Sequence, residues 1–368
     1  MKPTDTLYIN GKFLVQRMTG VQRFAHGLVA GLDDILVRNQ DLSPPVLLVP
    51  PGANRLPLVR IEQRECGIAS IPPTIWEQSC LPWAARDGAL LCLAGSAPFG
   101  GRLVIPTIHD AAVYNFPEAY SWKFVLWYRS LFYISSSASP INFTVSHSSA
   151  LDLERYLPGR QFRVIPNAAE HILYCEADMS VFERSGLEPG RFLIAVASQN
   201  LTKNLGFLVE AYARADLYPD VKLVFVGGKN TRVFSNCSSY NAVHGVVSLG
   251  EVSDEELRAL YQSALALVFP SVYEGFGIPP LEAMSCGCPV LASNSSSIPE
   301  VCGDAAYYFD PYNFDSLIEA LRTIVVSANL RADLIAKGHS RRLVYSWRRS
   351  SESLLSELQS IGLMKRGS

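Results

Sequence analysis

Residues 269–282 read Phe-Pro-Ser-Val-Tyr-Glu-Gly-Phe-Gly-Ile-Pro-Pro-Leu-Glu, and no other stretch of the 368-residue chain is as informative. An apolar run ends at Pro270, which predicts the end of a buried strand. Two glycines follow in a loop, where the backbone can approach a ligand closely. Pro279-Pro280 suits the first turn of a helix, because the N–H that proline lacks has no partner there.

The polar groups of this stretch suit a phosphorylated sugar ligand. A helix N-terminus offers free N–H groups and the positive end of the helix dipole, which favour a phosphate. Glu274 in the loop and Glu282 in the helix carry carboxylates that accept hydrogen bonds from sugar or ribose hydroxyls. A tight loop with two solvated carboxylates is the simpler structural interpretation.

Apolar runs of strand length alternate with amphipathic segments of helix length throughout the chain, which indicates parallel sheets covered by helices. Strands are predicted at 7–10, 45–50, 90–94, 103–109 and 141–146, then at 192–197, 222–226, 246–249, 266–270 and 289–292. Helices are predicted at 21–36, 205–216, 254–263 and 280–285. We therefore expect two α/β units of similar size, joined between Pro166 and Pro189.

Composition points to a globular protein that does not bind nucleic acid. The chain is 48% hydrophobic and 18% charged, so it can bury a sizeable core. A net charge of −2 disfavours nucleic acid as a partner. The charge is unevenly spread, at +3 over residues 1–165 and −5 over residues 166–368.

The sequence predicts a cytoplasmic setting. Residues 1–5 lack the apolar stretch of a signal peptide, and no apolar run is long enough to span a bilayer. None of the eight cysteines forms a Cys-x-x-Cys pair, and the six histidines fall at no metal-like spacing. We interpret the cysteines as small core residues and predict no metal site.

Residues 269–282 closely resemble the Glu-x7-Glu motif of retaining glycosyltransferases of family 4. The resemblance continues through residues 283–293, 298–301 and 304–311. Further matches follow the family's order along the chain, at residues 19–23, 108–110, 145–148, 164–167 and 202–204, and at Ser346-Trp347 before a terminal helix. Together these segments cover almost the whole chain.

The resemblance implies the GT-B architecture, in which two Rossmann-like domains face each other across a cleft. Residues 1–170 would form the acceptor domain, joined by a helix at 346–368 that crosses back to it. Residues 171–345 would form the nucleotide-sugar donor domain. The resemblance also implies a nucleotide-sugar co-substrate, with no other cofactor and no metal, and the chain has no Asp-x-Asp metal motif.

The family assigns a role to each matching residue of the second domain. Lys203 would neutralise the donor diphosphate, whereas the simpler interpretation is a solvated lysine at a helix start. Glu282 would hold the ribose hydroxyls, and Glu274 would hold hydroxyls of the transferred sugar. The sugar and its phosphate would be positioned by backbone groups of Gly275, Phe276, Gly277 and Ile278.

Two residues of the first domain complete the expected site. His109 follows a predicted strand, and ligands bind at that end of an open parallel sheet. The resemblance places His109 against the donor sugar, although a lone histidine is more often structural. Gly20 would let its loop approach the donor phosphate or the acceptor, whereas the simpler interpretation is an ordinary helix-start glycine. No role beyond surface or packing is predicted for His171.

The match departs from the family at two places. Family members often carry an arginine shortly before the lysine, whereas Ser198-Gln199-Asn200-Leu201-Thr202 precedes Lys203 here. Part of the expected cationic phosphate clamp is therefore missing or supplied elsewhere. After Asn167 the family often continues with glycine and an acidic residue, whereas this chain has Ala168-Ala169-Glu170.

Residues 122–133 read Trp-Lys-Phe-Val-Leu-Trp-Tyr-Arg-Ser-Leu-Phe-Tyr and allow two interpretations. A basic amphipathic helix rich in aromatic residues can lie in a membrane interface. Its lipid-facing residues would then be Trp122, Phe124, Trp127 and Phe132, with Lys123 and Arg129 toward an anionic surface. A helix packed on the first sheet explains the pattern as well, and we slightly favour core packing.

Residues 10–13 and 19–23 look like those of bacterial O-antigen and exopolysaccharide transferases, many of which transfer mannose or rhamnose. GDP-mannose is our first prediction for the donor, and a lipid-linked oligosaccharide or other saccharide for the acceptor, at the inner face of the membrane. Alternatives are a UDP-, dTDP- or ADP-sugar donor, a sugar-diphosphate epimerase or glycogen-synthase-like polymerase of the same architecture, and a catalytically silent paralogue that serves as a binding subunit.

Overall fold

The computed structural model describes residues 6–196, 200–228 and 243–364. The chain divides into two compact units, which are described separately. The first unit comprises residues 1–167 and 347–368, and the second comprises residues 168–346. The last helix of the chain thus belongs to the first unit.

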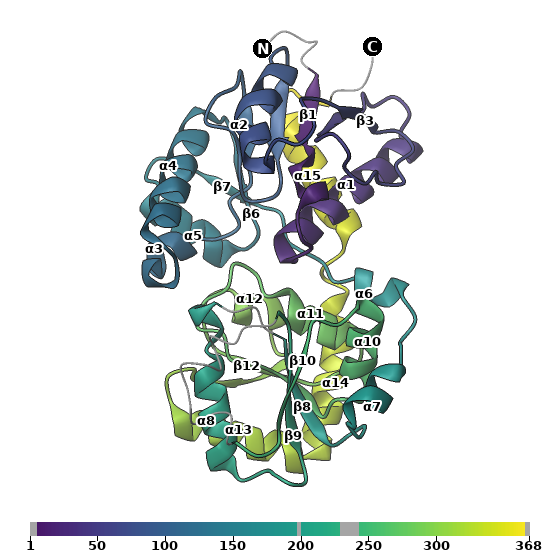
Figure 1. Cartoon of the computed structure of the whole chain (residues 1–368), viewed down its shortest axis with the longest axis vertical. Coiled ribbons are helices and arrows are strands. Elements are labelled where there is room, and N and C mark those ends of the chain that lie inside the picture. The colour runs from purple at the N-terminus through teal and green to yellow at the C-terminus, as the bar shows by residue number, and fades with distance from the viewer. Residues whose placement is uncertain (1–5, 197–199, 229–242, 365–368) are drawn as a thin grey trace. The chain divides into compact units, whose positions relative to one another are not determined.

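The first unit is built on a five-stranded parallel sheet in the order β3-β2-β1-β4-β5 (Figure 1). The strands are β1 (Leu7–Asn10), β2 (Val46–Val49), β3 (Glu62–Glu65), β4 (Ala89–Cys92) and β5 (Val104–Pro106). A second parallel pair, β6 (Asn142–Thr144) and β7 (Phe162–Val164), is linked to the end of β5 by a bridge between Thr107 and Phe143. The helices are η1 (Gly11–Val15), α1 (Gly20–Arg38), α2 (Pro73–Ala84), α3 (Ala112–Asn115), η2 (Pro117–Ala119), α4 (Trp122–Ala138), α5 (His147–Tyr156) and α15 (Trp347–Ser360).

The second unit carries a six-stranded parallel sheet in the order β10-β9-β8-β11-β12-β13. The strands are β8 (Phe192–Val196), β9 (Lys222–Val226), β10 (Val246–Gly250), β11 (Ala266–Phe269), β12 (Val290–Ser293) and β13 (Ala306–Phe309). The helices are α6 (His171–Tyr174), α7 (Ser180–Ser185), η3 (Leu201–Lys203), α8 (Leu205–Ala215), α10 (Asp254–Ser263), α11 (Ile278–Ser285), α12 (Ile298–Cys302), α13 (Phe314–Val326) and α14 (Ala328–Arg342).

Every predicted strand coincides with an observed one, because fully buried parallel strands are continuous apolar runs. The strand predicted at 103–109 is shorter, and residue 197 of the predicted 192–197 strand lies outside the described residues. Three observed strands are absent from the predicted ones: β3, whose Glu-Gln-Arg-Glu sequence pairs only at the sheet edge, and the short strands β7 and β13. The cysteine prediction holds for Cys92, Cys288 and Cys302, which are buried, but four others are only partly buried and Cys237 lies outside the described residues.

Both sheets reverse their strand order at one point. In the first sheet β1 lies between β2 and β4, and in the second β8 lies between β9 and β11. Loops that leave the carboxyl ends of the two central strands diverge to opposite faces, and the crevice between them is where open parallel sheets bind ligands. The fold therefore locates one candidate site in each unit before any side chain is considered.

Helices α1 and α15 pack closely within the first unit because glycines line their contact (Figure 1). A Cβ atom on Gly27 would lie 2.2 Å from the Trp347 ring, and one on Gly31 would lie 2.4 Å from Ser351 Oγ. The Ser351 hydroxyl also donates to the carbonyl of Leu28 (3.3 Å). Helix α15 thus fits the first unit only where α1 has no side chain.

Gly27→Ala is expected to lower the free energy of unfolding by about 1–3 kcal/mol, because the large Trp347 ring has to move out of a packed contact. Urea denaturation followed by tryptophan fluorescence measures the change. Gly100→Ala is the control, since a Cβ there meets no atom within 4 Å. Equal unfolding midpoints for the two variants would show that the α1–α15 contact is loose.

Candidate active site

The strand reversal in the second sheet brings together two segments that the sequence singled out. Strand β8 leads toward η3, and β11 leads into the loop 270–277. The two strands pair in parallel, with Leu193 opposite Ala266, so their carboxyl ends lie at the same edge. The N–H of Val272 donates to the carbonyl of Thr202 (2.8 Å) and joins the two segments directly.

Lys203 and Glu274 form an ion pair at this edge. The Lys203 Nζ lies 2.5 Å from Glu274 Oε1, and the side chains are 19% and 11% exposed. The same ammonium lies 5.8 Å from the centre of the Phe269 ring. The interpretation of Lys203 as a solvated lysine is therefore wrong, and the switch point presents a cation and a carboxylate side by side.

Serine hydroxyls from the last residue of β12 and from the segment after it hold the loop 270–277. Ser293, Ser295 and Ser297 donate to the carbonyls of Ser271, Val272, Glu274 and Phe276 over 2.5–3.0 Å. In return the N–H of Glu274 donates to Ser296 Oγ (2.9 Å). The sequence did not predict this role, because a run of serines indicates only a loop.

The glycine-rich end of the loop leads directly into α11. Gly277 has a φ of +96°, which favours glycine, and the helix begins at Ile278, two residues earlier than predicted. Phe276 is buried and packs edge-on against Tyr345, with ring centres 5.4 Å apart. Pro279-Pro280 removes two N–H donors from the first turn, so the helix offers a phosphate its dipole but few hydrogen bonds.

Glu282 is 5% exposed, so the interpretation of both carboxylates as solvated is wrong. Its Oε1 lies 2.8 Å from His171 Nε2, and its Oε2 accepts a hydrogen bond from the Tyr261 hydroxyl (3.1 Å). Burial and the nearby carboxylate raise the pKa of Tyr261 well above its usual value, so the phenol remains a donor. The sequence predicted no such role for His171, because 111 residues separate it from its partner.

His109 and Gly20 belong to the first unit and lie near each other there. Gly20 opens α1, and a Cβ on Gly95 would lie 3.6 Å from His109 and 3.7 Å from Val21, the next residue of α1. His109 Nε2 lies 2.9 Å from the carbonyl of Leu93, at the end of β4. Since a carbonyl only accepts, Nε2 carries the proton and Nδ1 keeps a lone pair.

The environment of His109 keeps its imidazole neutral. The ring packs edge-on against Phe24 at 4.9 Å between centres. Burial lowers its pKa to about 4, and the Leu93 carbonyl opposes the shift only in part. A neutral imidazole at a carboxyl sheet edge suits contact with an uncharged hydroxyl group.

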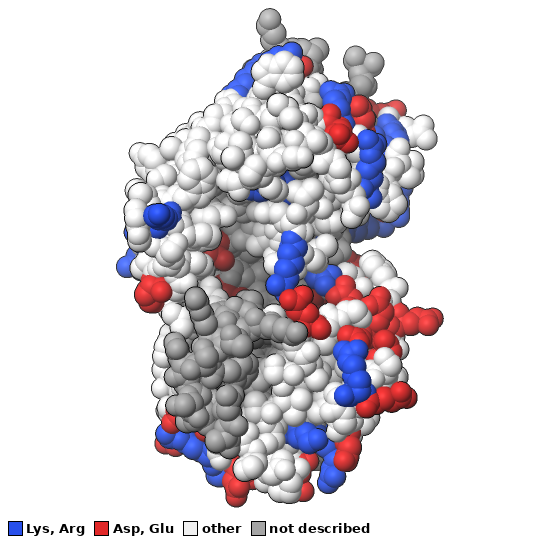
Figure 2. Space-filling model, in the orientation of Figure 1, with Lys and Arg blue, Asp and Glu red and all other residues white. Residues whose placement is uncertain are grey.

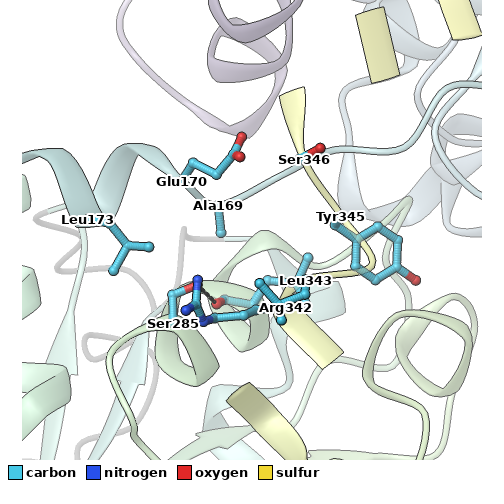
Figure 3. Close-up of a pocket in the computed structure, with 9 residues that line it drawn as sticks. Ala169, Glu170, Leu173, Ser285, Arg342, Leu343, Tyr345 and Ser346 are labelled. Atoms are coloured by element: carbon cyan, nitrogen blue, oxygen red, sulfur yellow. Dashed lines mark hydrogen bonds between the residues drawn. The ribbon is translucent and has the colours of Figure 1, made fainter. Parts of the chain in front are cut away.

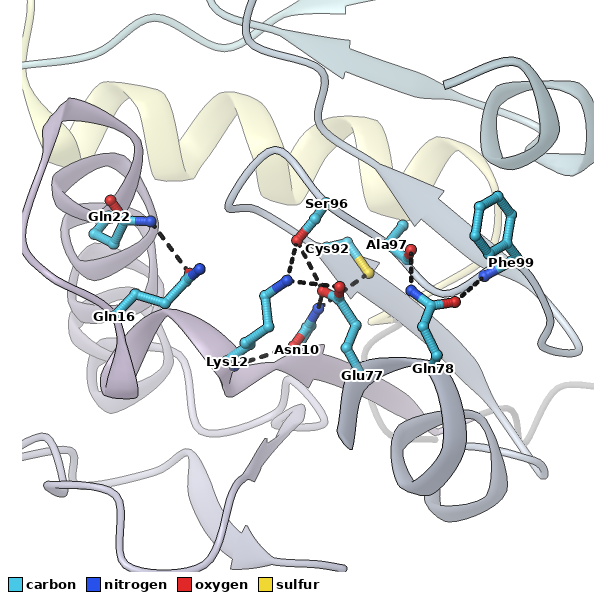
Figure 4. A network of polar contacts seen from close by, with 10 residues as sticks. All are labelled: Asn10, Lys12, Gln16, Gln22, Glu77, Gln78, Cys92, Ser96, Ala97 and Phe99. Carbon is cyan, nitrogen blue, oxygen red and sulfur yellow. Dashed lines mark hydrogen bonds and ion pairs between the residues drawn. The ribbon is translucent and has the colours of Figure 1, made fainter. Parts of the chain in front are cut away.

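A buried polar network occupies the switch point of the first sheet (Figure 4). Lys12 Nζ lies 2.6 Å from both Glu77 Oε2 and Ser96 Oγ. Asn10 Nδ2 and Ser96 Oγ donate to Glu77 Oε1 over 2.7 and 2.8 Å. All four residues are less than 9% exposed, so this network fixes the ends of β1 and β4.

A small cavity of about 70 Å³ adjoins α11 in the second unit (Figure 3). Its lining combines Leu173, Leu281 and Leu343 with Glu170, Arg342 and Ser285. Ligand pockets for molecules of nucleotide size measure several hundred Å³. This cavity is therefore too small to hold a nucleotide, and its lining does not include Lys203 or Glu274.

Only some of the residues that precede Lys203, where the family often has an arginine, belong to the described part of the chain. Asn200 accepts from the N–H of Thr202 (3.2 Å) and caps η3, whereas Ser198 and Gln199 lie outside the described residues. Within residues 6–196, 200–228 and 243–364, no group of three His, Cys, Asp or Glu residues is placed to hold a metal ion.

Comparisons with known proteins find similar chains among glycosyltransferases. Residues 181–341 match the family model of glycosyl transferases group 1. O-antigen chain mannosyltransferase B of Escherichia coli is 27% identical over 278 residues, which cover 72% of this chain and 73% of that protein. The serotype-specific mannosyltransferase WbdA of Escherichia coli is 31% identical over 245 residues, 63% of this chain but 29% of WbdA.

Solved structures extend the likeness of fold to nearly the whole chain. HepE of Anabaena, in complex with UDP, has a TM-score of 0.70 at 16% sequence identity. The alignment covers 97% of this chain and 100% of that one. At this identity the likeness concerns the fold alone.

The low pKa of His109 predicts a loss of stability in acid. The folded chain resists protonation down to about pH 4, whereas the unfolded chain takes up the proton near pH 6.5. The contribution of neutral His109 to the free energy of unfolding is complete above pH 6.5. It falls by at most about 3 kcal/mol as the pH drops to 4. Urea denaturation of wild type and of His109→Gln, which keeps a donor for Leu93, should show a weaker pH dependence in the variant. Parallel curves, or an NMR titration of the His109 ring near pH 6.5, would contradict the prediction.

Proposed function

We propose that this chain, which is a group 1 glycosyltransferase of the GT-B fold, transfers mannose from GDP-mannose to a saccharide or lipid-linked oligosaccharide of a bacterial surface polysaccharide. The reaction class is that of a retaining hexosyltransferase. The mannosyltransferases among its relatives support the choice of sugar. The second unit would bind the nucleotide sugar, and the first unit would receive the acceptor.

The observation that carries the proposal is the pairing of Lys203 with Glu274 at the strand reversal of the second sheet. The ammonium would stabilise the charge that grows on the leaving diphosphate. The Glu274 carboxylate would accept hydrogen bonds from hydroxyls of the transferred sugar, beside the backbone of Gly275, Phe276, Gly277 and Ile278. Because α11 has few free N–H groups, Lys203 would be the main partner of the phosphates.

The remaining site residues are assigned by their chemistry. Glu282 would hold the ribose hydroxyls, because it is a buried carboxylate with acceptor capacity left on both oxygens. His109 would contact a hydroxyl of the donor sugar as a neutral imidazole, and Gly20 would give the donor phosphate access to the start of α1. We propose no metal and no other cofactor, because Lys203 and the dipole of α11 supply the positive charge.

The exposed residues of helix α4 support the proposal that the protein meets its acceptor at a membrane surface. Trp122, Leu126 and Tyr133 are 71%, 60% and 57% exposed, and Phe124, Trp127 and Ile134 are 39–42% exposed. Figure 2 shows a largely uncharged face over this part of the first unit. The buried residues of α4 are Leu131, Phe132, Ser135 and Ser136, and Tyr128 packs against the same core cluster. Core packing thus applies to this edge of the helix, and Trp127 contacts Phe99 edge-on.

The charges around α4 fit this role only in part. Lys123 is exposed, with its Nζ 5.7 Å from the centre of the Trp122 ring. Arg129, predicted to face an anionic surface, instead donates to the carbonyl of Val113 (3.0 Å). Phe132, predicted to face lipid, is 6% exposed. No helix in the described part of the chain is long and apolar enough to cross a membrane, and we propose peripheral binding at the cytoplasmic face.

A transfer assay with GDP-mannose and a polyprenyl-diphosphate-linked mannosyl oligosaccharide tests the function. We expect GDP release and an α-linked product by NMR, which denotes retention. Lys203→Ala should reduce kcat by about 100-fold, the effect of removing one group that stabilises transition-state charge. EDTA should leave the rate unchanged.

The matched control is Lys337→Ala, which also removes a lysine paired with a carboxylate, Asp333 at 2.6 Å, but on an exposed helix. A thermal-shift screen of GDP, UDP, dTDP and ADP shows whether another donor fits better. Tighter binding of another nucleotide would mean that the donor is a sugar of that nucleotide and not GDP-mannose. A β-linked product would refute retention. Full turnover by Lys203→Ala would refute the proposed site.

Flotation with anionic liposomes tests the surface of α4. Wild type should float at low salt and less at high salt, because exposed charges are screened over about 8–10 Å at physiological ionic strength. Trp122→Ser with Leu126→Ser should float several-fold less, since two exposed apolar side chains are lost. Tyr312→Ser, an aromatic that is 71% exposed in the second unit, is the control. Equal flotation of all three proteins would reject α4 as the contact.

A further inference from the structure

Helix α6 opens the second unit and places its first residue against α11 and α10. His171 Nε2 lies 2.8 Å from Glu282 Oε1 on α11, and the Tyr261 hydroxyl on α10 reaches the other oxygen of the same carboxylate. The side chain of His171 is 17% exposed and that of Glu282 is 6% exposed. Three elements separated in sequence therefore converge on one buried carboxylate.

The chemistry of the carboxylate fixes the role of the histidine. An ionised carboxylate only accepts hydrogen bonds. His171 Nε2 therefore carries a hydrogen and donates a hydrogen bond to Glu282 Oε1. The Tyr261 phenol donates to the second oxygen. Two donors on different oxygens fix the rotation of the carboxylate plane, and about two of its four lone-pair positions remain available.

Other groups near the contact are engaged elsewhere. Arg258 on α10 donates to the carbonyls of Leu173 and Cys175. Within the described residues, the Nδ1 of His171 is buried without a hydrogen-bond partner. The ring is therefore held in the described structure by its one hydrogen bond, which is directed at Glu282.

We propose that His171 is a positioning residue for Glu282, and that it sets the affinity for the ribose of the donor nucleotide without touching the nucleotide. The inference rests on the proposed role of Glu282 at the ribose. By fixing the two remaining lone-pair directions, His171 preorganises the carboxylate for two neighbouring hydroxyls. Loss of this hydrogen bond leaves the carboxylate buried with one donor fewer and free to rotate.

Isothermal titration calorimetry with GDP and 2′,3′-dideoxy-GDP tests the inference, or with the UDP pair if UDP binds better in the screen. His171→Ala should weaken GDP binding about tenfold or more, the range for a hydrogen bond to a charged group. It should leave the binding of the dideoxy nucleotide within about twofold, because that ligand has no ribose hydroxyls. His171→Gln should recover most of the GDP affinity, because its amide nitrogen can occupy the place of Nε2.

Two further variants separate the possible failures. Tyr174→Ala changes an 80% exposed residue of the same short helix and should bind GDP as wild type does. Glu282→Gln should weaken GDP binding and abolish the difference between the two ligands. If Glu282→Gln binds GDP normally, the proposed ribose site itself is wrong. If Glu282→Gln is weakened but His171→Ala is not, or if His171→Ala weakens both ligands equally, the positioning role is refuted.

Steady-state kinetics provide an independent readout. His171→Ala should raise the KM for the nucleotide sugar about tenfold and change kcat less than threefold, because the ribose is held alike before and during transfer. A fall in kcat with an unchanged KM would contradict the inference.

Discussion

Ser293, Ser295 and Ser297 donate hydrogen bonds to carbonyl groups of the loop 270–277. These bonds hold the loop from which Glu274 extends and after which α11 begins. Backbone carbonyls in a buried loop need partners, and here the hydroxyls of the neighbouring strand end supply them. With its carbonyls held, the loop can direct the Glu274 side chain at Lys203 and reach the left-handed conformation at Gly277. The start of α11, and hence the place of Glu282, follows from that turn.

Each unit places a lysine and a glutamate at its strand reversal, but the two pairs differ in kind. The side chains of Lys12 and Glu77 are 6% and 1% exposed, and Asn10 and Ser96 complete their hydrogen bonds. Such a buried pair, once formed, is costly to break, so it serves as a fixed part of the scaffold. Lys203 and Glu274 are more accessible and have fewer hydrogen-bond partners among the described residues. Their charges can be redirected to a ligand at a smaller cost, which is the property that a binding site needs.

The sequence predicts the two parallel sheets well because a strand buried on both faces is a continuous apolar run. It also singles out Glu274 and Glu282, which share one local motif, and Lys203, which lies in a second short segment at residues 202–204. The pairing of Lys203 with Glu274 across 71 residues is created by the fold. The sequence does not reveal the contact of His171 with Glu282, because proximity between residues so far apart is created only by the fold. The pattern of residues 122–133 was ambiguous for a different reason. Large aromatic residues occupy both edges of α4, so periodicity alone cannot separate the buried Phe132 from the exposed Trp122.

The assignment of α15 to the first unit has a consequence for synthesis on the ribosome. Residues 168–346 form a contiguous unit and can fold as soon as they emerge, whereas the first unit lacks the helix that covers Gly27 and Gly31 of α1 until residues 347–360 have been made. At about 5–20 residues per second, the intervening segment takes roughly ten to forty seconds to make. During that interval α1 lacks the partner that packs on Gly27, on Gly31 and on the ring of Phe24, whose centre lies 6.3 Å from that of Trp347. Of the two units, the first thus begins earlier along the chain and is completed later.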